Sequence, residues 1–290
     1  MYAVGSRPGL LYGLPKAHKE GFPIRPVLSA LKTPGYNISK FVTSMTDIYA
    51  KNEYTLLNSI ELVDHIKTFK FEKGMVMTSF DVESLYTKVP VKETIELITN
   101  HIYEKEQTTI RNMNKKTFTN LLNLTTSNSY FMFNNKYYYQ NEGLAMGQPL
   151  SAPLANIFLC LKEKQWLEDC PNEFKPAMYK RYVDDTFVIF RKQEHVDKFF
   201  EYINKQHQNI KFTKESEEDK KLPFLDILLE HNDNGNIKTS IYRKKTYTGA
   251  GINFISHVYN NYKMSAFSSF LFRAWRLTND YLSFHLSGHS

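Results

Sequence analysis

The sequence has little of what secreted, fibrous and membrane proteins depend on. It holds two cysteines, Cys160 and Cys170, in 290 residues, which are too few for a disulfide framework or for a zinc site of their own. Its 12 glycines and 11 prolines form no repeat, which excludes collagen-like and linker-like chains. The longest apolar stretch, residues 154–161, is interrupted by Asn156 and is far shorter than the roughly 20 residues of a membrane span. We therefore expect an intracellular globular protein with no signal peptide, no transmembrane segment and no membrane partner.

The charge is unevenly distributed along the chain. Residues 1–40 carry six lysines and arginines against one glutamate, and residues 238–290 carry seven against one aspartate. Because the whole chain has a net charge of only +7, its middle is acidic. Basic ends suit the phosphates of a nucleic acid, and an acidic centre suits divalent cations. For the charges alone, a solvated surface is the simpler explanation.

The apolar periodicity predicts a mixture of strands and helices. Strands are expected at 76–82, at 179–190 with a turn at the Asp pair, near 224–230 and near 237–243, with a hairpin turning at 134–136. Helices are expected at 91–104, at 118–124, from 151 onward and at 196–207. This order predicts an α+β fold, a sheet with helices packed on one side.

The sharpest chemical signal is the pair Asp184 and Asp185 between two apolar strands. Adjacent carboxylates repel each other, and apolar neighbours such as Val183 increase the repulsion unless a cation neutralises it. Asp81 ends an earlier apolar strand, and pairing of the strands would bring three carboxylates together. Such a group can hold two Mg²⁺ ions about 3.5–4 Å apart and catalyse phosphoryl transfer. For the Asp pair alone, an ordinary turn is the simpler explanation.

Several ordered segments give these carboxylates a context. Residues 80–86 (FDVESLY), 143–151 (GLAMGQPLS) and 182–185 (YVDD) resemble, in this order, the palm motifs of reverse transcriptases. Residues 14–19 (LPKAHK) and 24–27 (IRPV) resemble the fingers segment of the same family.

The tail of the chain points to a subgroup of that family. Residues 222–226 (LPFLD), 241–245 (IYRKK) and 273–274 (RA) are similar to the tail of Penelope-like retroelements. Since the similarity runs from about residue 12 to residue 276, the sequence is identified as a reverse transcriptase of the Penelope-like retroelement family.

The resemblance implies a fold and a division into domains. The fold is the right-hand polymerase fold, with a ferredoxin-like palm sheet, partial fingers and a truncated helical thumb. Fingers are expected at 1–75, the palm at 76–248 with a helical insert at about 91–128, and the start of the thumb at 249–290. The chain begins almost at the fingers motif and ends soon after the implied first thumb helix, 265–276, so we expect a polymerase core cut from a longer protein or a partial gene copy.

The resemblance also assigns catalytic roles. Asp81, Asp184 and Asp185 are the implied catalytic residues. Asp81 and Asp184 are the main ligands of two Mg²⁺ ions, for which Mn²⁺ could substitute. Asp185 assists them, and the backbone carbonyl of Val82 completes one metal shell.

The implied nucleotide-binding residues are Arg25, Lys16, Tyr86, Gly147 and Gln148. The Tyr86 ring would lie under the incoming sugar and collide with a 2′-hydroxyl, which favours deoxynucleotides; a core tyrosine is the alternative explanation. The planar guanidinium of Arg25 can grip phosphate oxygens in a bidentate manner, and Gly147 lets the backbone approach a ligand.

The implied contacts to primer and duplex are Tyr242, Arg243 and Lys244. These roles together predict an RNA-directed DNA polymerase that adds deoxynucleotides to a primer 3′-hydroxyl. Its partners are an RNA template, a DNA primer and deoxynucleoside triphosphates, and its site of action is the nucleus. No protein partner is inferred.

Two alternatives remain at this point. A catalytically impaired or domesticated copy would bind an RNA–DNA duplex without turnover. An RNA-dependent RNA polymerase shares the palm but must admit a 2′-hydroxyl, against which Tyr86 speaks.

Overall fold

The computed structural model describes residues 6–16, 21–127, 129–232, 235–244, 246–249 and 251–279. The last part of the expected fingers segment 14–19, Lys245 of the segment 241–245, and residues 280–290 of the expected thumb therefore lie outside the described residues. The chain forms two compact units that alternate along the sequence. The first unit comprises residues 1–55, 82–170 and 202–212, and the second comprises 56–81, 171–201 and 213–290.

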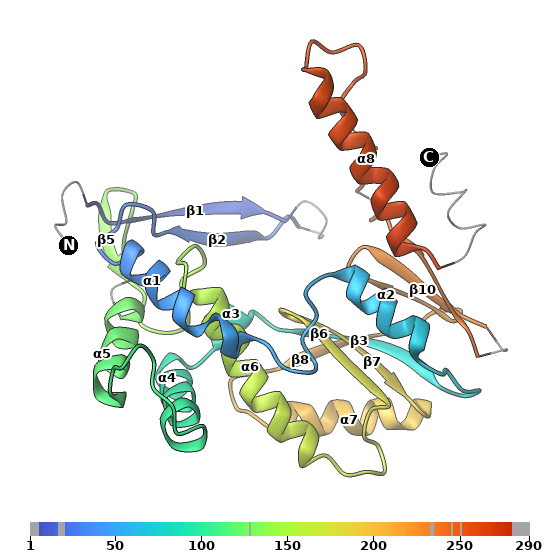
Figure 1. The fold of residues 1–290 in the computed structure, drawn as a ribbon, viewed down its shortest axis with the longest axis horizontal. Coiled ribbons are helices and arrows are strands. Elements are labelled where there is room, and N and C mark those ends of the chain that lie inside the picture. The colour runs from blue at the N-terminus through green and yellow to red at the C-terminus, as the bar shows by residue number, and fades with distance from the viewer. Residues whose placement is uncertain are drawn as a thin grey trace. The chain divides into compact units, whose positions relative to one another are not determined.

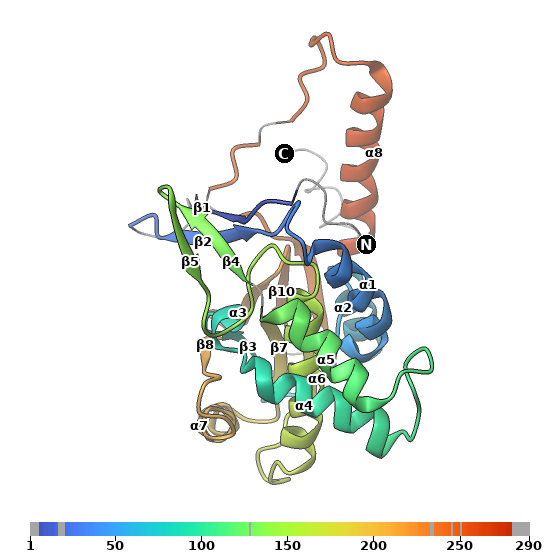
Figure 2. The ribbon, with the colours of Figure 1, turned by 90° about the vertical axis from the view of Figure 1, so that its left-hand side faces the viewer.

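The first unit contains a four-stranded sheet, which we call the N-terminal sheet, in the order β2-β1-β4-β5. Its strands are β1 (Gly9–Pro15), β2 (Ile24–Ser29), β4 (Tyr130–Phe133) and β5 (Lys136–Tyr139). Figure 2 shows these strands side by side. Asn134 and Asn135 have φ angles of 49° and 58°, as a two-residue hairpin turn of this kind requires. Lys136, expected in the turn, is therefore the first residue of β5.

The remaining described elements of the first unit are helical. They are α1 (Tyr36–Thr46), the 3₁₀ helix η1 (Asp47–Ala50), α3 (Leu85–Lys88), α4 (Val91–Asn100) with its π-helical extension η2 (His101–Lys105), α5 (Lys115–Thr126) and α6 (Ser151–Glu168). The side chain of Asn114 caps α5 by accepting a hydrogen bond from Thr117 N at 2.9 Å, which satisfies one of the free N–H groups at the helix start. Helices α4 and α5 occupy the expected helical insert.

The second unit contains the sheet of the carboxylate motifs, in the order β6-β7-β3-β8. Its strands are β3 (Val76–Val82), β6 (Met178–Tyr182), β7 (Asp185–Phe190) and β8 (Phe212–Ser216), with α7 (Gln193–Lys205) between β7 and β8. The first and third strands in chain order lie in the middle, which is the ferredoxin-like arrangement. Every residue of β7 after Asp185 is buried, because this central strand is covered on both faces.

The second unit also holds a three-stranded sheet and two helices. These are β9 (Lys221–Phe224), β10 (Ile227–His231), β11 (Ile237–Ile241), α2 (Ser59–Thr68) and α8 (Asn260–Leu277). One apolar core joins α2, both sheets and the end of α8, and includes Leu62, Met77, Phe187, Leu229 and Leu277. On the other face of the ferredoxin-like sheet, Phe80 packs against Phe199 of α7 at 5.9 Å between ring centroids. Figure 1 shows α8 as a long helix extending away from β10.

The expected α+β class is confirmed, with differences in detail. The described residues form three sheets where one was expected. The strand expected near 224–230 is two strands, β9 and β10, because the chain reverses at Leu225 and Asp226. Leu225 has a φ of 54°, and a leucine carries no turn signal in the sequence. Within the described residues, no helix is long and apolar enough to span a membrane.

Candidate active site

Asp81 and Asp185 face each other in neighbouring strands of the ferredoxin-like sheet. The antiparallel register pairs Asp81 of β3 with Asp185 of β7, and Tyr182 of β6 with the same Asp185. Directly opposite side chains in such a pair have Cβ atoms about 4.5–5.5 Å apart, so the two carboxylates share one face of the sheet. Asp184 stands in the two-residue turn between β6 and β7 and is half-buried. The adjacency follows from strand register, whereas the role of these residues as metal ligands stays a prediction.

The turn that carries Asp184 has an unusual backbone. Val183 has a φ of 57°, a left-handed conformation that is rare for a β-branched residue. The buried Arg181 donates a hydrogen bond from Nη1 to the Val183 carbonyl oxygen at 2.8 Å. The Arg181 carbonyl in turn accepts a hydrogen bond from Leu56 N at 2.7 Å. A buried guanidinium therefore holds the strained residue next to the Asp pair.

The carboxylates raise one another's energy when they are ionised. Burial, followed by the charges of Asp184 and Asp81, raises the pKa of Asp185 from 3.8 to about 6. The positive charge of Lys244 acts in the opposite direction on this pKa. Lys244, which the sequence analysis expects to contact the duplex, therefore stabilises the ionised form of Asp185.

The donor chemistry of this group suits a divalent cation. Magnesium prefers carboxylate and carbonyl oxygens, and a cation would relieve the repulsion that raises the pKa of Asp185. Within the described part of the chain, no three His, Cys, Asp or Glu side chains are arranged so that they could hold a metal ion. The aspartates therefore supply fitting ligands without a finished coordination shell. Val82 is the last residue of β3, and its side chain is buried.

In the first unit, Tyr86 and Gly147 are held by backbone contacts. Tyr86 is half-buried in α3, and its carbonyl accepts a hydrogen bond from Leu144 N at 2.6 Å. Gly147 has a φ of 110°, and a Cβ at this position would come within 2.4 Å of the Leu28 carbonyl oxygen. Since only glycine fits this close approach, Gly147 has a packing role against β2 that the sequence does not reveal.

The other nucleotide-contact candidates also belong to the first unit. Gln148 donates a hydrogen bond from Nε2 to the carbonyl of Thr125 at the end of α5, which ties the loop before α6 to that helix. Arg25 is exposed on β2, where the register pairs it with Leu14 of β1. Lys16 follows β1 and is half-buried.

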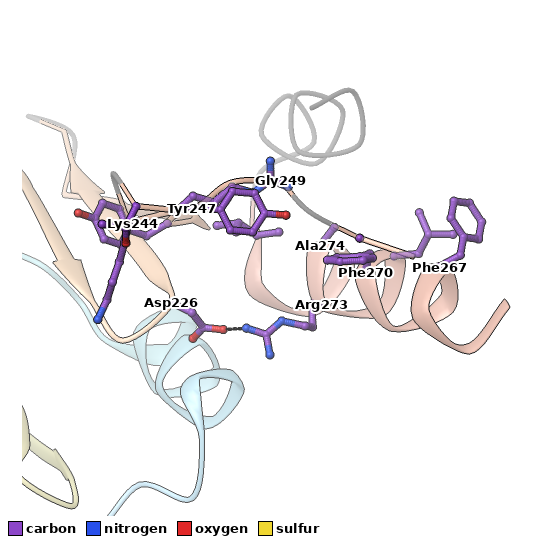
Figure 3. A pocket seen from close by; sticks show the side chains of 14 residues that line it. Asp226, Lys244, Tyr247, Gly249, Phe267, Phe270, Arg273 and Ala274 are labelled. Atoms are coloured by element: carbon purple, nitrogen blue, oxygen red, sulfur yellow. Dashed lines mark hydrogen bonds and ion pairs between the residues drawn. The ribbon is translucent and has the colours of Figure 1, made fainter. Parts of the chain in front are cut away.

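A cavity of about 680 Å³ lies in the second unit between α8 and the segment after β11. Tyr242, Arg243 and Lys244 line it, so the three expected duplex contacts come together there. Figure 3 shows Arg273 of α8 pointing at Asp226, with which it forms an ion pair across the cavity.

Asp226 joins three segments that are far apart in the sequence. Its carboxylate pairs with Arg273 and accepts a hydrogen bond from Ser59 Oγ. Its backbone carbonyl accepts a hydrogen bond from Tyr242 N at 2.9 Å. The segments 222–226, 241–245 and 273–274 therefore meet at one residue, which the sequence did not single out.

Comparison with protein families decides the class. A family model described as reverse transcriptase (RNA-dependent DNA polymerase) matches residues 17–225. This chain belongs to the reverse transcriptase family. The matched range contains the three aspartates, Arg25 and the segment 143–151, and it ends before the cavity residues 242–244. No curated protein matches the sequence of the chain.

Solved structures share the fold of this reverse transcriptase at low sequence identity. Telomerase from Candida albicans in complex with a TWJ fragment of telomeric RNA matches with a TM-score of 0.63 and 10% identity, over 94% of this chain and 51% of that one. Apo telomerase from Candida tropicalis, truncated from its C-terminal domain, matches with a TM-score of 0.56 and 14% identity, over 80% and 55% of the two chains. The chain thus spans about half the length of these telomerases. The expected right-hand polymerase fold is confirmed.

Arg181 is the residue of this reverse transcriptase site that sequence reasoning missed. The available signal was an arginine in a short predicted strand, directly before the YVDD turn. Arginine is almost never fully buried unless it is paired, so a buried position implies a fixed partner. The structure identifies the Val183 carbonyl as one such partner.

The raised pKa of Asp185 predicts a pH-dependent stability. Because this pKa is higher in the folded chain than in the unfolded chain, stability is lost as the pH rises from about 4 to about 6, and stays lost above that range. In chelator, Asp185→Asn should therefore raise the free energy of unfolding by about 1–2 kcal/mol at pH 7.5, allowing for partial exposure. At pH 4 it should change little. Urea denaturation at pH 7.5 and at pH 4 measures the two free energies of unfolding. An equal increase at both pH values would contradict the repulsion between Asp185 and its neighbouring carboxylates.

The contact of Arg181 predicts a change in cation binding. Arg181→Met removes the hydrogen-bond donor to the Val183 carbonyl. We therefore expect the Mg²⁺ concentration for half-maximal thermal stabilisation to rise about tenfold, which corresponds to the loss of about one charged hydrogen bond. Arg181→Lys keeps the positive charge but lacks the planar guanidinium. The Mg²⁺ concentration that it needs for half-maximal stabilisation should therefore lie between those of the unmodified chain and Arg181→Met. Adding Val183→Gly to Arg181→Met should recover part of the lost stability, because glycine adopts a positive φ freely. If Arg181→Met lowers the melting temperature but leaves its dependence on Mg²⁺ unchanged, Arg181 stabilises the fold without affecting cation binding.

Proposed function

We propose that this chain is the polymerase core of a Penelope-like retroelement reverse transcriptase, acting in the nucleus. It is an RNA-directed DNA polymerase that adds deoxynucleotides to a primer 3′-hydroxyl on an RNA template. The observation that carries the proposal is the pairing of Asp81 with Asp185 beside Asp184, in a chain of the reverse transcriptase family.

The chemistry of the proposed reaction follows from the carboxylates. Asp81, Asp184, Asp185 and the Val82 carbonyl would hold two Mg²⁺ ions. Such ions, when bound, lower the pKa of an attacking hydroxyl and neutralise the charge of a triphosphate. The chain's own part is to keep Asp81 and Asp185 opposite each other through the β3–β7 register, and to hold the turn that carries Asp184 through the Arg181 contact to Val183. Positioning of this kind supplies much of the catalysis in phosphoryl transfer.

Nucleotide selection is proposed to rest on Arg25, Lys16, Tyr86, Gly147 and Gln148. Arg25 and Lys16 would bind phosphates, and Tyr86 would exclude the 2′-hydroxyl. Gly147 and Gln148 would shape the loop before α6, a role that the φ of Gly147 and the Gln148 contact to α5 support.

The Penelope-like subgroup and the domain division are part of the same proposal. The convergence of 222–226, 241–245 and 273–274 on Asp226 supports the subgroup, because segments similar to its tail form one connected cluster. We propose fingers at 1–75, palm at 76–248 and the start of the thumb at 249–290. Tyr242, Arg243 and Lys244 in the cavity wall would contact the primer and the duplex.

Primer extension on an RNA template tests the function. Asp184→Asn should reduce incorporation by at least about 100-fold, because several kcal/mol of charge stabilisation is lost at the metals. Binding of an RNA–DNA duplex should persist, since cations on phosphates dominate that affinity. Asp64→Asn, an exposed position on α2, is the matched control and should retain activity. Incorporation by the unmodified chain in excess chelator would contradict the metal role, and duplex binding without any incorporation would favour the domesticated copy.

The proposed sugar selection has its own test at Tyr86. Tyr86→Ala should retain deoxynucleotide incorporation and accept ribonucleotides at least about tenfold better, because a clash is removed and no contact is added. Tyr86→Phe should keep the wild-type preference. The ratio of the two incorporation rates, measured together with the melting temperature, checks this. An unchanged ratio with a lower melting temperature would identify Tyr86 as a core side chain and strengthen the RNA-polymerase alternative.

A further inference from the structure

Helix α8 is packed against the second unit at its last turn. Among its described residues, only Ala274 and Leu277 are buried, and Arg273 stands directly before this packed end. Since an α-helix rises about 1.5 Å per residue, the stretch from Asn260 to Arg273 is about 20 Å long. A small rotation at the packed end would therefore move the start of α8 by a larger distance, so a contact at the edge of that end controls the orientation of the helix.

Asp226 makes a contact at this edge. Its Oδ2 pairs with Nη2 of Arg273, and its Oδ1 accepts a hydrogen bond from Ser59 Oγ at the start of α2. The positive end of the α2 dipole also favours a carboxylate at this place. Because Ser59 fixes one carboxylate oxygen, the other stays directed at Arg273 (Figure 3).

The same residue connects the two walls of the cavity of about 680 Å³. Residues 242–244 lie in one wall, and Phe270 and Arg273 of α8 lie in the other. The backbone carbonyl of Asp226 accepts a hydrogen bond from Tyr242 N at 2.9 Å, while its carboxylate pairs with Arg273. Asp226 therefore fixes the wall that α8 supplies relative to the wall that carries the expected duplex contacts.

The cavity continues along α8 as a groove. A second cavity of about 420 Å³ shares Gly251, Phe267 and Phe270 with the first. Among the described residues that line the two cavities, Asp226 is the one carboxylate, against four lysines and arginines. A negative charge weakens the attraction of such a groove for phosphates, so its place there indicates a role other than binding them.

We propose that Asp226 is a positioning residue for the RNA–DNA duplex, which acts through Arg273 to fix the orientation of α8 across the groove from residues 242–244. This rests on the proposed function, in which those three residues contact primer and duplex. Of the two side chains, 29% of Asp226 and 52% of Arg273 are exposed, so the ion pair adds little to the stability of the fold. Its loss shortens the time for which a duplex stays bound and leaves the chain folded.

The experiment measures how fast a short fluorescein-labelled RNA–DNA hybrid with a template overhang dissociates from the full chain, in chelator and with excess unlabelled hybrid. Asp226→Asn removes the charge and keeps a side chain that suits a turn. It should raise the dissociation rate at least about fivefold, because a loosened α8 must be ordered by the duplex. Adding Asp226→Asn to Arg273→Gln should change the rate no further than Arg273→Gln alone, since both variants remove one contact. In Mg²⁺, the rate of single-nucleotide addition at saturating hybrid should stay within about twofold of that of the unmodified chain.

Asp64 provides the matched control on the same helix. It pairs with Arg276 of α8 at 3.3 Å, next to the buried Leu277, which keeps this end of the helix in place. Asp64→Asn and Asp226→Asn each remove one negative charge, and electrostatics alone would slow dissociation in both. Faster dissociation in Asp226→Asn only is therefore the expected result, and an equal change in the two variants would overturn the proposal. A melting temperature lowered by more than about 4 °C, together with slower nucleotide addition, would make Asp226 a stabilising residue and would overturn it too.

Failure of this role and failure of the proposed function give different results. If Asp226→Asn releases the hybrid as slowly as the unmodified chain does, and the unmodified chain extends primers, only the positioning role is wrong. If Asp226→Asn releases the hybrid faster and the unmodified chain extends no primer, the positioning role stands and the polymerase proposal falls.

Discussion

The antiparallel pairing of β3 with β7 is the constraint on which the site of this chain depends. Because side chains alternate between faces along a strand, a shift of one residue would move Asp81 to the opposite face from Asp185. Apolar side chains on both faces of β7 hold this register. On one face Phe187 and Ile189 pack in the core with α2 and the three-stranded sheet, and on the other face Phe190 packs against Phe199 of α7. The packing of the second unit therefore determines whether two distant aspartates meet.

Gathering carboxylates at the end of a sheet lowers the stability of the fold, and one buried contact offsets part of that loss. The pKa of Asp185 is raised to about 6, which records the repulsion, and Val183 adds a left-handed backbone beside it. The buried Arg181 holds this turn by its contact to the Val183 carbonyl. Such local strain at a cluster of like charges is typical of sites that are completed by a ligand.

A second organising point is Asp226. It lies where the chain reverses between β9 and β10, pairs with Arg273 of α8 and accepts a hydrogen bond from Tyr242 N. The segments that resemble a Penelope-like tail therefore act as one structural unit around a single carboxylate. This accounts for the position of α8 next to the loop that carries Arg243 and Lys244.

The sequence by itself determined the α+β class, the strand that contains Asp81 and the strand that begins with Asp185, the helices α4 to α7, and the reverse transcriptase family. It could do so because periodicity and short ordered motifs are local properties of the chain. It did not determine the division of strand 224–230 at Leu225, the packing role of Gly147, or the burial of Arg181. Each of these depends on a partner distant in sequence or on a backbone angle that the residue type does not signal. Tyr12, Tyr130, Tyr137 and Tyr139 likewise share one face of the N-terminal sheet only because β4 pairs with both β1 and β5. Tertiary structure decided which of the many tyrosines share a surface, since pairing between strands, and not spacing along them, sets which side chains become neighbours.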